Sequence, residues 1–155
     1  MEKKTLFYLS LSTGFFSGLW IIIGIYFNIP TWIGFAGCTA FFAAGSDGVK
    51  GVKKAIFPLL SGIFWTVLLL NLSNGSTSSI FIGTLGGIIT FIMCFQGIFP
   101  LLAYIPATFI GSFSTFANNG NWREVLIGVL SGLVLGYLSD FGGKALLNLT
   151  SKKNK

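Results

Sequence analysis

Charged residues are scarce in this sequence. Only 9% of its 155 residues are Asp, Glu, Lys or Arg, whereas an ordinary soluble domain carries about 25%. A water-soluble fold would need charged side chains to cover its surface, and this chain has too few of them. Hydrophobic residues make up 53% of the sequence, and the mean hydropathy is +0.82. The composition excludes an ordinary soluble domain and predicts an integral membrane protein.

Histidine is absent, and only four residues are acidic. Hydrolytic catalysis needs a nucleophile with a general base or a metal-bound water. The two cysteines, Cys38 and Cys94, lie in separate apolar segments and form no C-x-x-C motif. A zinc site would lack its usual set of ligands. We therefore expect no enzyme activity, no catalytic residue, no metal site and no cofactor.

The centres of the apolar segments contain no charged residue. Proton-coupled carriers use intramembrane carboxylates or histidines as relays, and voltage sensors use arginines. The absence of such residues argues against both classes of protein. The net charge of +6 is confined to the breaks between apolar segments. It does not alternate with aromatic residues along one solvated face, so we expect no nucleic-acid partner.

The apolar segments predict an all-α fold with six transmembrane helices, because one span needs about 20 mainly apolar residues. The predicted spans are about 5–27, 31–46, 55–72, 80–96, 98–117 and 124–140. Only Gln96, Gly97 and Pro100 separate the fourth span from the fifth. One long helix, kinked at the proline, is the alternative there.

The distribution of basic residues predicts the orientation of these spans. Lys and Arg collect in the cytoplasmic loops of membrane proteins. With six spans and a cytoplasmic N-terminus, every lysine falls on the cytoplasmic side and only Arg123 falls outside. We therefore expect a multi-pass protein of the bacterial inner membrane with both termini in the cytoplasm. Residues 141–155 then form a basic cytoplasmic tail.

Short blocks of the sequence recur in the same order in its two halves. Residues 35–43 resemble residues 109–117, and Leu-Ser-Gly occurs at both 60–62 and 130–132. A G-x-x-x-G pair also begins at Gly14 and again at Gly83. The recurrence predicts one membrane domain over 1–155 that contains two repeats.

The first repeat would cover about 5–72 and the second about 80–140. Because each holds three spans, the two copies would be inverted across the membrane. Inverted repeats are common in transporters and channels, where the solute path lies between the halves.

Small and hydroxyl-bearing residues are frequent in the predicted spans. Glycines permit helices to pack closely in lipid. Hydroxyl groups in or beside the repeated blocks could instead line a pore for a neutral solute, and a pair of phenylalanines could narrow it. The candidate pore-lining residues are Thr39, Phe42, Ser61, Thr108, Ser112, Phe116 and Ser131. Packing is the alternative role for each of them.

Two prolines and one aspartate are further candidates. Pro58 and Pro106 fall in predicted spans, where a proline either makes a packed kink or breaks a helix that lines the path. Asp47 lies in the most polar loop and would form the cytoplasmic mouth or cap a helix N-terminus.

Three motifs are similar to those of one protein family. They are W-x-x-F-x-G-x-x-x-F-F-A-x-G over 32–45, I-P-x-x-F-x-G over 105–111 and L-S-G-x-x-x-G-Y-x-S over 130–139. The chain resembles the domain of unknown function 1097 family, the small YcdZ-like bacterial inner-membrane proteins. The resemblance extends over nearly the whole chain. It implies an inner-membrane location and no particular substrate.

These observations favour a passive channel or facilitator for a small neutral or weakly polar solute. The lipid bilayer, that solute and a second copy of the chain in a homo-oligomer are the expected partners. The solute path would run between the two halves or within the homo-oligomer. The alternatives are a non-transporting membrane partner and a carrier that couples a small solute to an ion.

Overall fold

The computed structural model describes residues 3–45 and 48–152, and this part of the chain is helical with no β-strand. The helices are α1 Lys3–Tyr26, α2 Thr31–Ala43, α3 Gly48–Ser73, α4 Ser79–Phe95, α5 Ile105–Ala117 and α6 Trp122–Lys152, with a short 3-10 helix η1 at Gln96–Ile98. The all-α class is confirmed, and α4 and α5 are two separate helices.

Four of the helical segments are long and apolar enough to cross a membrane: Lys3–Tyr26, Gly48–Ser73, Ser79–Ile98 and Trp122–Ser151. Helices α2 and α5 have only 13 residues each. At 1.5 Å per residue each is about 20 Å long, which is less than the hydrocarbon thickness of about 30 Å. The predicted ranges 31–46 and 98–117 were therefore too long.

The ends of α2 and α5 have local causes. Helix α2 begins directly after Pro30 and ends before Gly45, whose φ of +102° is left-handed. The chain between η1 and Tyr104 is a turn, and α5 begins only at Ile105. Hydropathy alone does not mark the start of α5, because residues 98–103 before it are mostly apolar.

Helix α6 is longer than the sequence indicates. It continues to Lys152, so residues 141–152 are helical. Gly142 lies against Ser12 of α1, and Gly143 lies against the backbone of Leu9. The part of α6 past the predicted end at 140 is therefore packed against α1.

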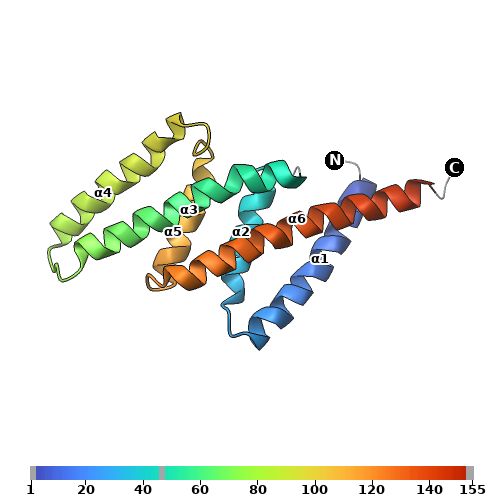
Figure 1. Ribbon diagram of the computed structural model, residues 1–155, viewed down its shortest axis with the longest axis horizontal. Coiled ribbons are helices and arrows are strands. Elements are labelled where there is room, and N and C mark those ends of the chain that lie inside the picture. The colour runs from blue at the N-terminus through green and yellow to red at the C-terminus, as the bar shows by residue number, and fades with distance from the viewer. Residues whose placement is uncertain (1–2, 46–47, 153–155) are drawn as a thin grey trace.

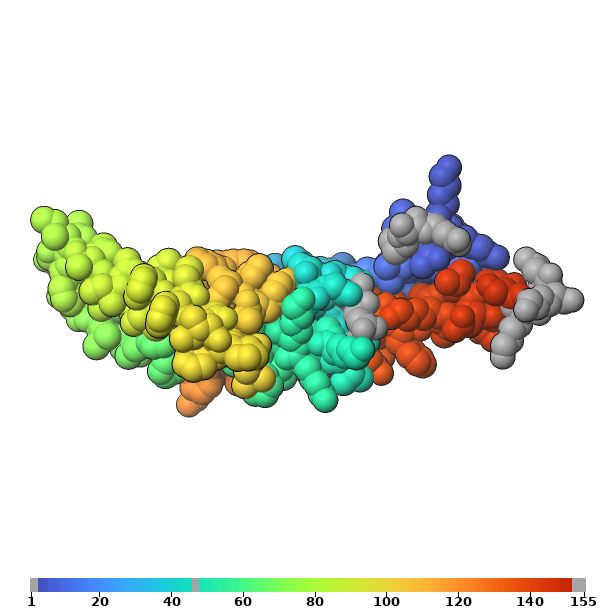
Figure 2. Space-filling view, turned by 90° about the horizontal axis from the view of Figure 1, so that it is seen from above, coloured from blue at the N-terminus to red at the C-terminus, as the bar shows by residue number. Residues whose placement is uncertain are grey.

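The helices form a thin, elongated body (Figures 1 and 2). Helix α1 packs along α6, and α4 packs along α3. The short helices α2 and α5 lie at the centre, where α2 crosses α6 and α5 crosses α3 (Figure 1). The described ends of the chain, at the start of α1 and the end of α6, lie close to each other in this view.

Four glycines bring the crossing helices into backbone contact. A Cβ on Gly62 would meet the Thr108 carbonyl, and one on Gly111 would meet the Leu59 carbonyl. The α2–α6 crossing has the same form, with Gly37 against the Val129 backbone and Gly132 against the Gly34 carbonyl. This geometry confirms that these glycines serve close helix packing.

Candidate functional site

Gln96 lies at the centre of a polar cluster between α3, α4 and α5. It follows the last residue of α4, and its side chain is 7% exposed. Its Oε1 accepts hydrogen bonds from Ser61 Oγ at 2.6 Å and from Trp65 Nε1 at 3.0 Å. Its Nε2 donates to Thr108 Oγ1 at 3.2 Å. One amide side chain therefore joins the end of α4 to both α3 and α5.

A second hydroxyl pair extends this cluster along the α3–α5 crossing. Thr66 Oγ1 and Ser112 Oγ are 2.7 Å apart, and both residues are buried. Thr66 follows Trp65 in α3, and Ser112 lies one turn beyond Thr108 in α5. Six residues thus form what we term the Gln96 cluster: Ser61, Trp65, Thr66, Gln96, Thr108 and Ser112.

The chemistry of the Gln96 cluster is neutral. Its members carry hydroxyl, amide and indole groups, and none of them is ionised at physiological pH. Polar groups in a membrane are costly unless they are hydrogen-bonded, and these groups satisfy one another. Ser61 and Trp65 are only partly buried, so the cluster reaches the surface of α3. Such a row can offer hydrogen bonds to a small neutral molecule, but it contains no group that relays protons.

The structure brings only three of the seven candidate pore-lining residues together. Ser61, Thr108 and Ser112 all belong to the Gln96 cluster. Thr39 is exposed and donates to the Phe35 carbonyl one turn earlier, at 2.9 Å. Its hydrogen bond is therefore local to α2.

The other three candidates lie apart from the cluster. Phe42 packs against Phe41 and the core, with ring centroids 5.4 Å apart. Phe116 is 46% exposed on the outer face of α5. Ser131 lines an apolar groove between α1 and α6. The seven residues do not line one path within a single chain.

Sequence reasoning missed Gln96, Trp65 and Thr66. One signal for Gln96 was present, because it is the chain's single glutamine and lies between two apolar runs. A glutamine at that place needs a partner, since an amide in an apolar environment is costly when unpaired. The sequence around Gln96 does not show which residues are its hydrogen-bond partners.

On the other side of the molecule, Trp20 of α1 lies against α2. The Trp20 ring is next to Gly34. Its Nε1 donates to the Thr31 carbonyl at 2.8 Å. Ser131 faces the apolar groove that Trp20 also lines.

The two candidate helix-breaking prolines differ in position. Pro58 is buried inside α3, well past its first turn. Pro106 lies in the first turn of α5, where its missing N–H removes no helical hydrogen bond. Pro106 therefore starts a helix and does not break one, contrary to the expectation from the longer predicted span. The candidate mouth residue Asp47 lies outside the described residues.

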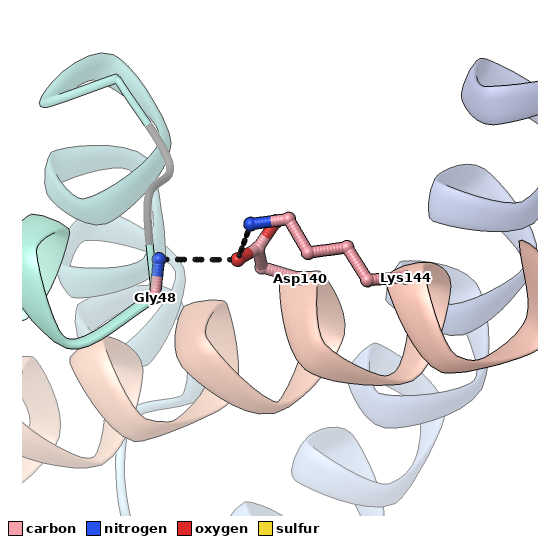
Figure 3. A network of polar contacts seen from close by, with 3 residues as sticks. All are labelled: Gly48, Asp140 and Lys144. Carbon is pink, nitrogen blue, oxygen red and sulfur yellow. Dashed lines mark hydrogen bonds and ion pairs between the residues drawn. The ribbon is translucent and has the colours of Figure 1, made fainter. Parts of the chain in front are cut away.

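Asp140 of α6 forms a second polar contact between the halves, at the start of α3 (Figure 3). Its side chain is buried, and its Oδ2 accepts a hydrogen bond from the Gly48 N–H at 3.2 Å. The same oxygen pairs with Lys144 Nζ at 2.7 Å. Because Gly48 is the first residue of α3, the carboxylate lies at the positive end of that helix. Asp140 thus has one partner in α3, the Gly48 N–H, and one in its own helix, Lys144.

Comparisons with known proteins give a consistent result. The profile of the family described as "Protein of unknown function (DUF1097)" matches residues 10–144. "Inner membrane protein YcdZ" of Escherichia coli K12 is 36% identical over 148 residues, which cover 93% of this chain and 89% of the relative. The Salmonella typhimurium LT2 protein with the same name is 38% identical over 136 residues, covering 87% and 85%.

A third relative is more distant. "Uncharacterized protein YahC" of Escherichia coli K12 is 30% identical over 156 residues, which cover 93% of this chain and 94% of the relative. No solved structure matches the chain.

Proposed function

Because the chain belongs to the DUF1097 family, whose relatives include inner-membrane proteins, we propose that it is a passive inner-membrane facilitator for a small, neutral or weakly polar solute. The observation that carries the proposal is the Gln96 cluster. It is a row of hydrogen-bonding side chains with no charge, placed between apolar helices. A pore for a neutral solute needs only a few such groups.

The neutrality of the cluster favours passive movement over ion coupling. A coupled carrier usually has an intramembrane carboxylate or histidine near the solute. The chain has no histidine, and the buried carboxylate of Asp140 is occupied by Gly48 and Lys144. We therefore favour a facilitator over an ion-coupled carrier.

We place the path at the surface of the chain and not between its halves, because those halves are in backbone contact. At Gly62 and Gly111 the backbones of α3 and α5 touch, and α2 and α6 touch in the same way. A solute does not fit between such backbones. The Gln96 cluster reaches the surface at Ser61 and Trp65 instead. A homo-oligomer would then complete the path by covering this surface with a second copy.

The arrangement of helices supports an inverted repeat. Gly37 contacts Val129, and Gly111 contacts Leu59 in the same way. Gly111 follows Gly37 by 74 residues, and Val129 follows Leu59 by 70 residues. A half-turn in the plane of Figure 1 brings α1, α2 and α3 onto α4, α5 and α6. With an inverted repeat, both termini would lie on one side of the membrane, which the lysines indicate is the cytoplasmic side.

A vesicle swelling assay tests the proposed function. The purified chain would be reconstituted in lipid vesicles, and water, urea and glycerol would be tried as solutes. We expect flux of at least one of them above that of empty vesicles, and a loss of this extra flux in Gln96→Leu. Thr39→Val is the matched control, because that hydroxyl lies outside the cluster, and it should keep the wild-type rate. Empty-vesicle rates for every solute would overturn the proposal.

A second candidate function is supported by a separate observation. Gly14 and Gly18 on α1, like Gly83 and Gly87 on α4, face open space. Small residues on an open helix face are typical of helix–helix association in membranes. The chain could therefore bind and position another membrane protein without transporting anything. Stoichiometric co-purification with a different protein, together with absent solute flux, would favour this function.

A further inference from the structure

Two hollows meet on the surface between α3 and α6, near the last turn of α3 and the first turn of α6. One has a volume of about 330 Å³ and is lined by Val67, Leu70, Asn71, Asn119, Gly120 and Trp122. The other has a volume of about 250 Å³ and is lined by Leu60, Ile63, Phe64, Val67, Trp122 and Leu126. Because Val67 and Trp122 line both hollows, these form one groove, polar at one end and apolar at the other. We term it the Trp122 groove.

The polar end of the Trp122 groove has hydrogen-bonding groups that the chain does not use. Asn71 Nδ2 donates to the Val67 carbonyl at 2.8 Å, but its Oδ1 has no partner among the residues that the structure describes. The side-chain amide of Asn119 has none among them either, and Asn119 lies in the turn before α6 with a left-handed φ of +53°. Both asparagines are exposed. The polar end can therefore bind a ligand with hydroxyl groups or acidic oxygens.

A cation lies beside the same polar end. Arg123 Cζ is 5.4 Å from the centre of the Trp122 ring, and a guanidinium over a ring can still donate hydrogen bonds from its edge. Within residues 3–45 and 48–152, Arg123 has no ion pair. The next residue, Glu124, accepts a hydrogen bond from Asn118 Nδ2 at 3.0 Å instead. A positive charge without a partner in this part of the chain thus lies at the rim of the groove, which predicts an anionic ligand.

We infer that the Trp122 groove binds one phospholipid with an anionic headgroup, of the phosphatidylglycerol type. Its phosphate accepts hydrogen bonds from the Arg123 guanidinium, and its glycerol hydroxyls bond the side-chain amides of Asn71 and Asn119. One acyl chain lies in the apolar end of the groove, along α3 toward the middle of that helix. Trp122 then lies at the boundary between headgroups and hydrocarbon, where tryptophan is enriched in membrane proteins. The inference is independent of whether a solute crosses the membrane.

The two ends of the groove together favour this ligand over the other candidates. A free phosphate would bond Arg123 but would use none of the apolar end. An ethanolamine headgroup would bring an ammonium group beside Arg123, and the adjacent carboxylate of Glu124 already bonds Asn118. An anionic phospholipid uses both ends of the groove and also pairs with the charge of Arg123.

Native mass spectrometry of the delipidated full chain in detergent tests the headgroup preference. Phosphatidylglycerol and phosphatidylethanolamine with the same acyl chains would be titrated separately. We expect phosphatidylglycerol to bind about fivefold more tightly, since one arginine near the membrane surface contributes about that factor to the binding of an anionic lipid. Arg123→Gln should bind the two lipids equally, and its thermal midpoint without lipid should be unchanged because Arg123 is exposed. Lys4→Gln, which removes an exposed charge at the start of α1, should keep the preference. Equal binding of both lipids to the wild type, or a preference that Arg123→Gln retains, would overturn the inference.

A photoreactive lipid locates the site without any variant. Phosphatidylglycerol with a diazirine in one acyl chain would be irradiated with the wild-type chain in phosphatidylcholine vesicles, and the labelled peptides would be identified by mass spectrometry. We expect label on residues 60–67 of α3 and on Leu126 of α6, reduced by excess unlabelled phosphatidylglycerol but not by glycerol 3-phosphate. Loss of label with glycerol 3-phosphate would make the occupant a free phosphate. Label spread evenly over the exposed faces of α1 and α4 would leave only unselective boundary lipid. Either result would overturn the inference.

Discussion

The Ser61 hydroxyl donates to the Gln96 side-chain oxygen at 2.6 Å, and this hydrogen bond joins α3 to the end of α4. Few other side chains attach α4 to the rest of the molecule, because only Ile89 and Met93 are buried along it. The amide therefore has two consequences. It secures α4, and it brings the polar groups of three helices to one place.

Gln96→Leu should destabilise the chain because it removes three hydrogen bonds and leaves their partners unpaired. Hydrogen bonds between membrane helices contribute about 0.6 kcal/mol each on average, so we expect a loss of about 2 kcal/mol. Unfolding of the detergent-solubilised protein by titration with a denaturing detergent would measure it. In Thr39→Val, which loses a bond within one helix, the change should be much smaller. Equal stability of Gln96→Leu and wild type would contradict this role.

The Thr66–Ser112 pair should show a measurable coupling energy. The two hydroxyls are 2.7 Å apart and buried, so Thr66→Val and Ser112→Ala each remove the same interaction. We expect the double variant to be less destabilised than the sum of the single variants, with a coupling of about 0.6 to 1.7 kcal/mol. Strict additivity in this double-mutant cycle would show that the pair does not interact.

Gly62→Ala should separate α3 from α5, because its new methyl group would meet the Thr108 carbonyl. Overpacking of this kind costs about 1 to 3 kcal/mol, and the thermal midpoint in detergent should fall. Gly14→Ala is the matched control, because nothing lies within 4 Å of its Cβ position. This control should be neutral or stabilising, by up to about 1 kcal/mol. Similar effects of the two variants would argue against the close α3–α5 crossing.

Asp140→Leu should destabilise the start of α3. The variant loses the acceptor for the Gly48 N–H and the ion pair with Lys144. Loss of a helix cap costs about 1 kcal/mol, and a favourable charge near a helix end contributes a similar amount. Hydrogen exchange by mass spectrometry should show faster exchange in the first turns of α3. Asp140→Asn should show a weaker effect, since its amide oxygen can still accept the Gly48 N–H. Unchanged exchange in Asp140→Leu would contradict the capping role.

Both ends of the chain should lie on one side of the membrane. Single cysteines at Ser151 and Asn119, introduced in a chain that lacks Cys38 and Cys94, would report the two sides of α6. We expect a membrane-impermeant maleimide, added to intact cells, to label the cysteine at 119 and to leave the one at 151 unlabelled. The reverse pattern in inside-out vesicles is the control. Labelling of position 151 in intact cells would contradict the six-span orientation.

Much of the fold could be predicted because apolar runs separated by polar breaks mark helices in a membrane. The ends of helices were harder to predict. Helix α2 ends where Gly45 takes a left-handed conformation, and this depends on the backbone and not on hydropathy. Helix α6 continues past residue 140, where Gly142 and Gly143 pack against α1, and no local pattern in the sequence contains that long-range contact.

The candidate site could be predicted only in part. Repeated blocks and hydroxyl side chains indicated Ser61, Thr108 and Ser112, which the fold brings together. The same reasoning included Thr39 and Phe116, which lie on outer faces. Composition identifies which side chains can form hydrogen bonds, but helix crossings decide which of them meet. Gln96 became central only because α4 ends beside both α3 and α5.

The dependence of solute flux on ion gradients tests the proposed passive function most directly. Initial rates of urea and glycerol entry would be measured in vesicles that contain the wild-type chain, with proton or sodium gradients imposed in either direction. A passive, uncharged path predicts entry faster than in empty vesicles, in proportion to the solute gradient and unchanged by either ion gradient. Entry no faster than in empty vesicles, or entry that follows an ion gradient, would contradict it.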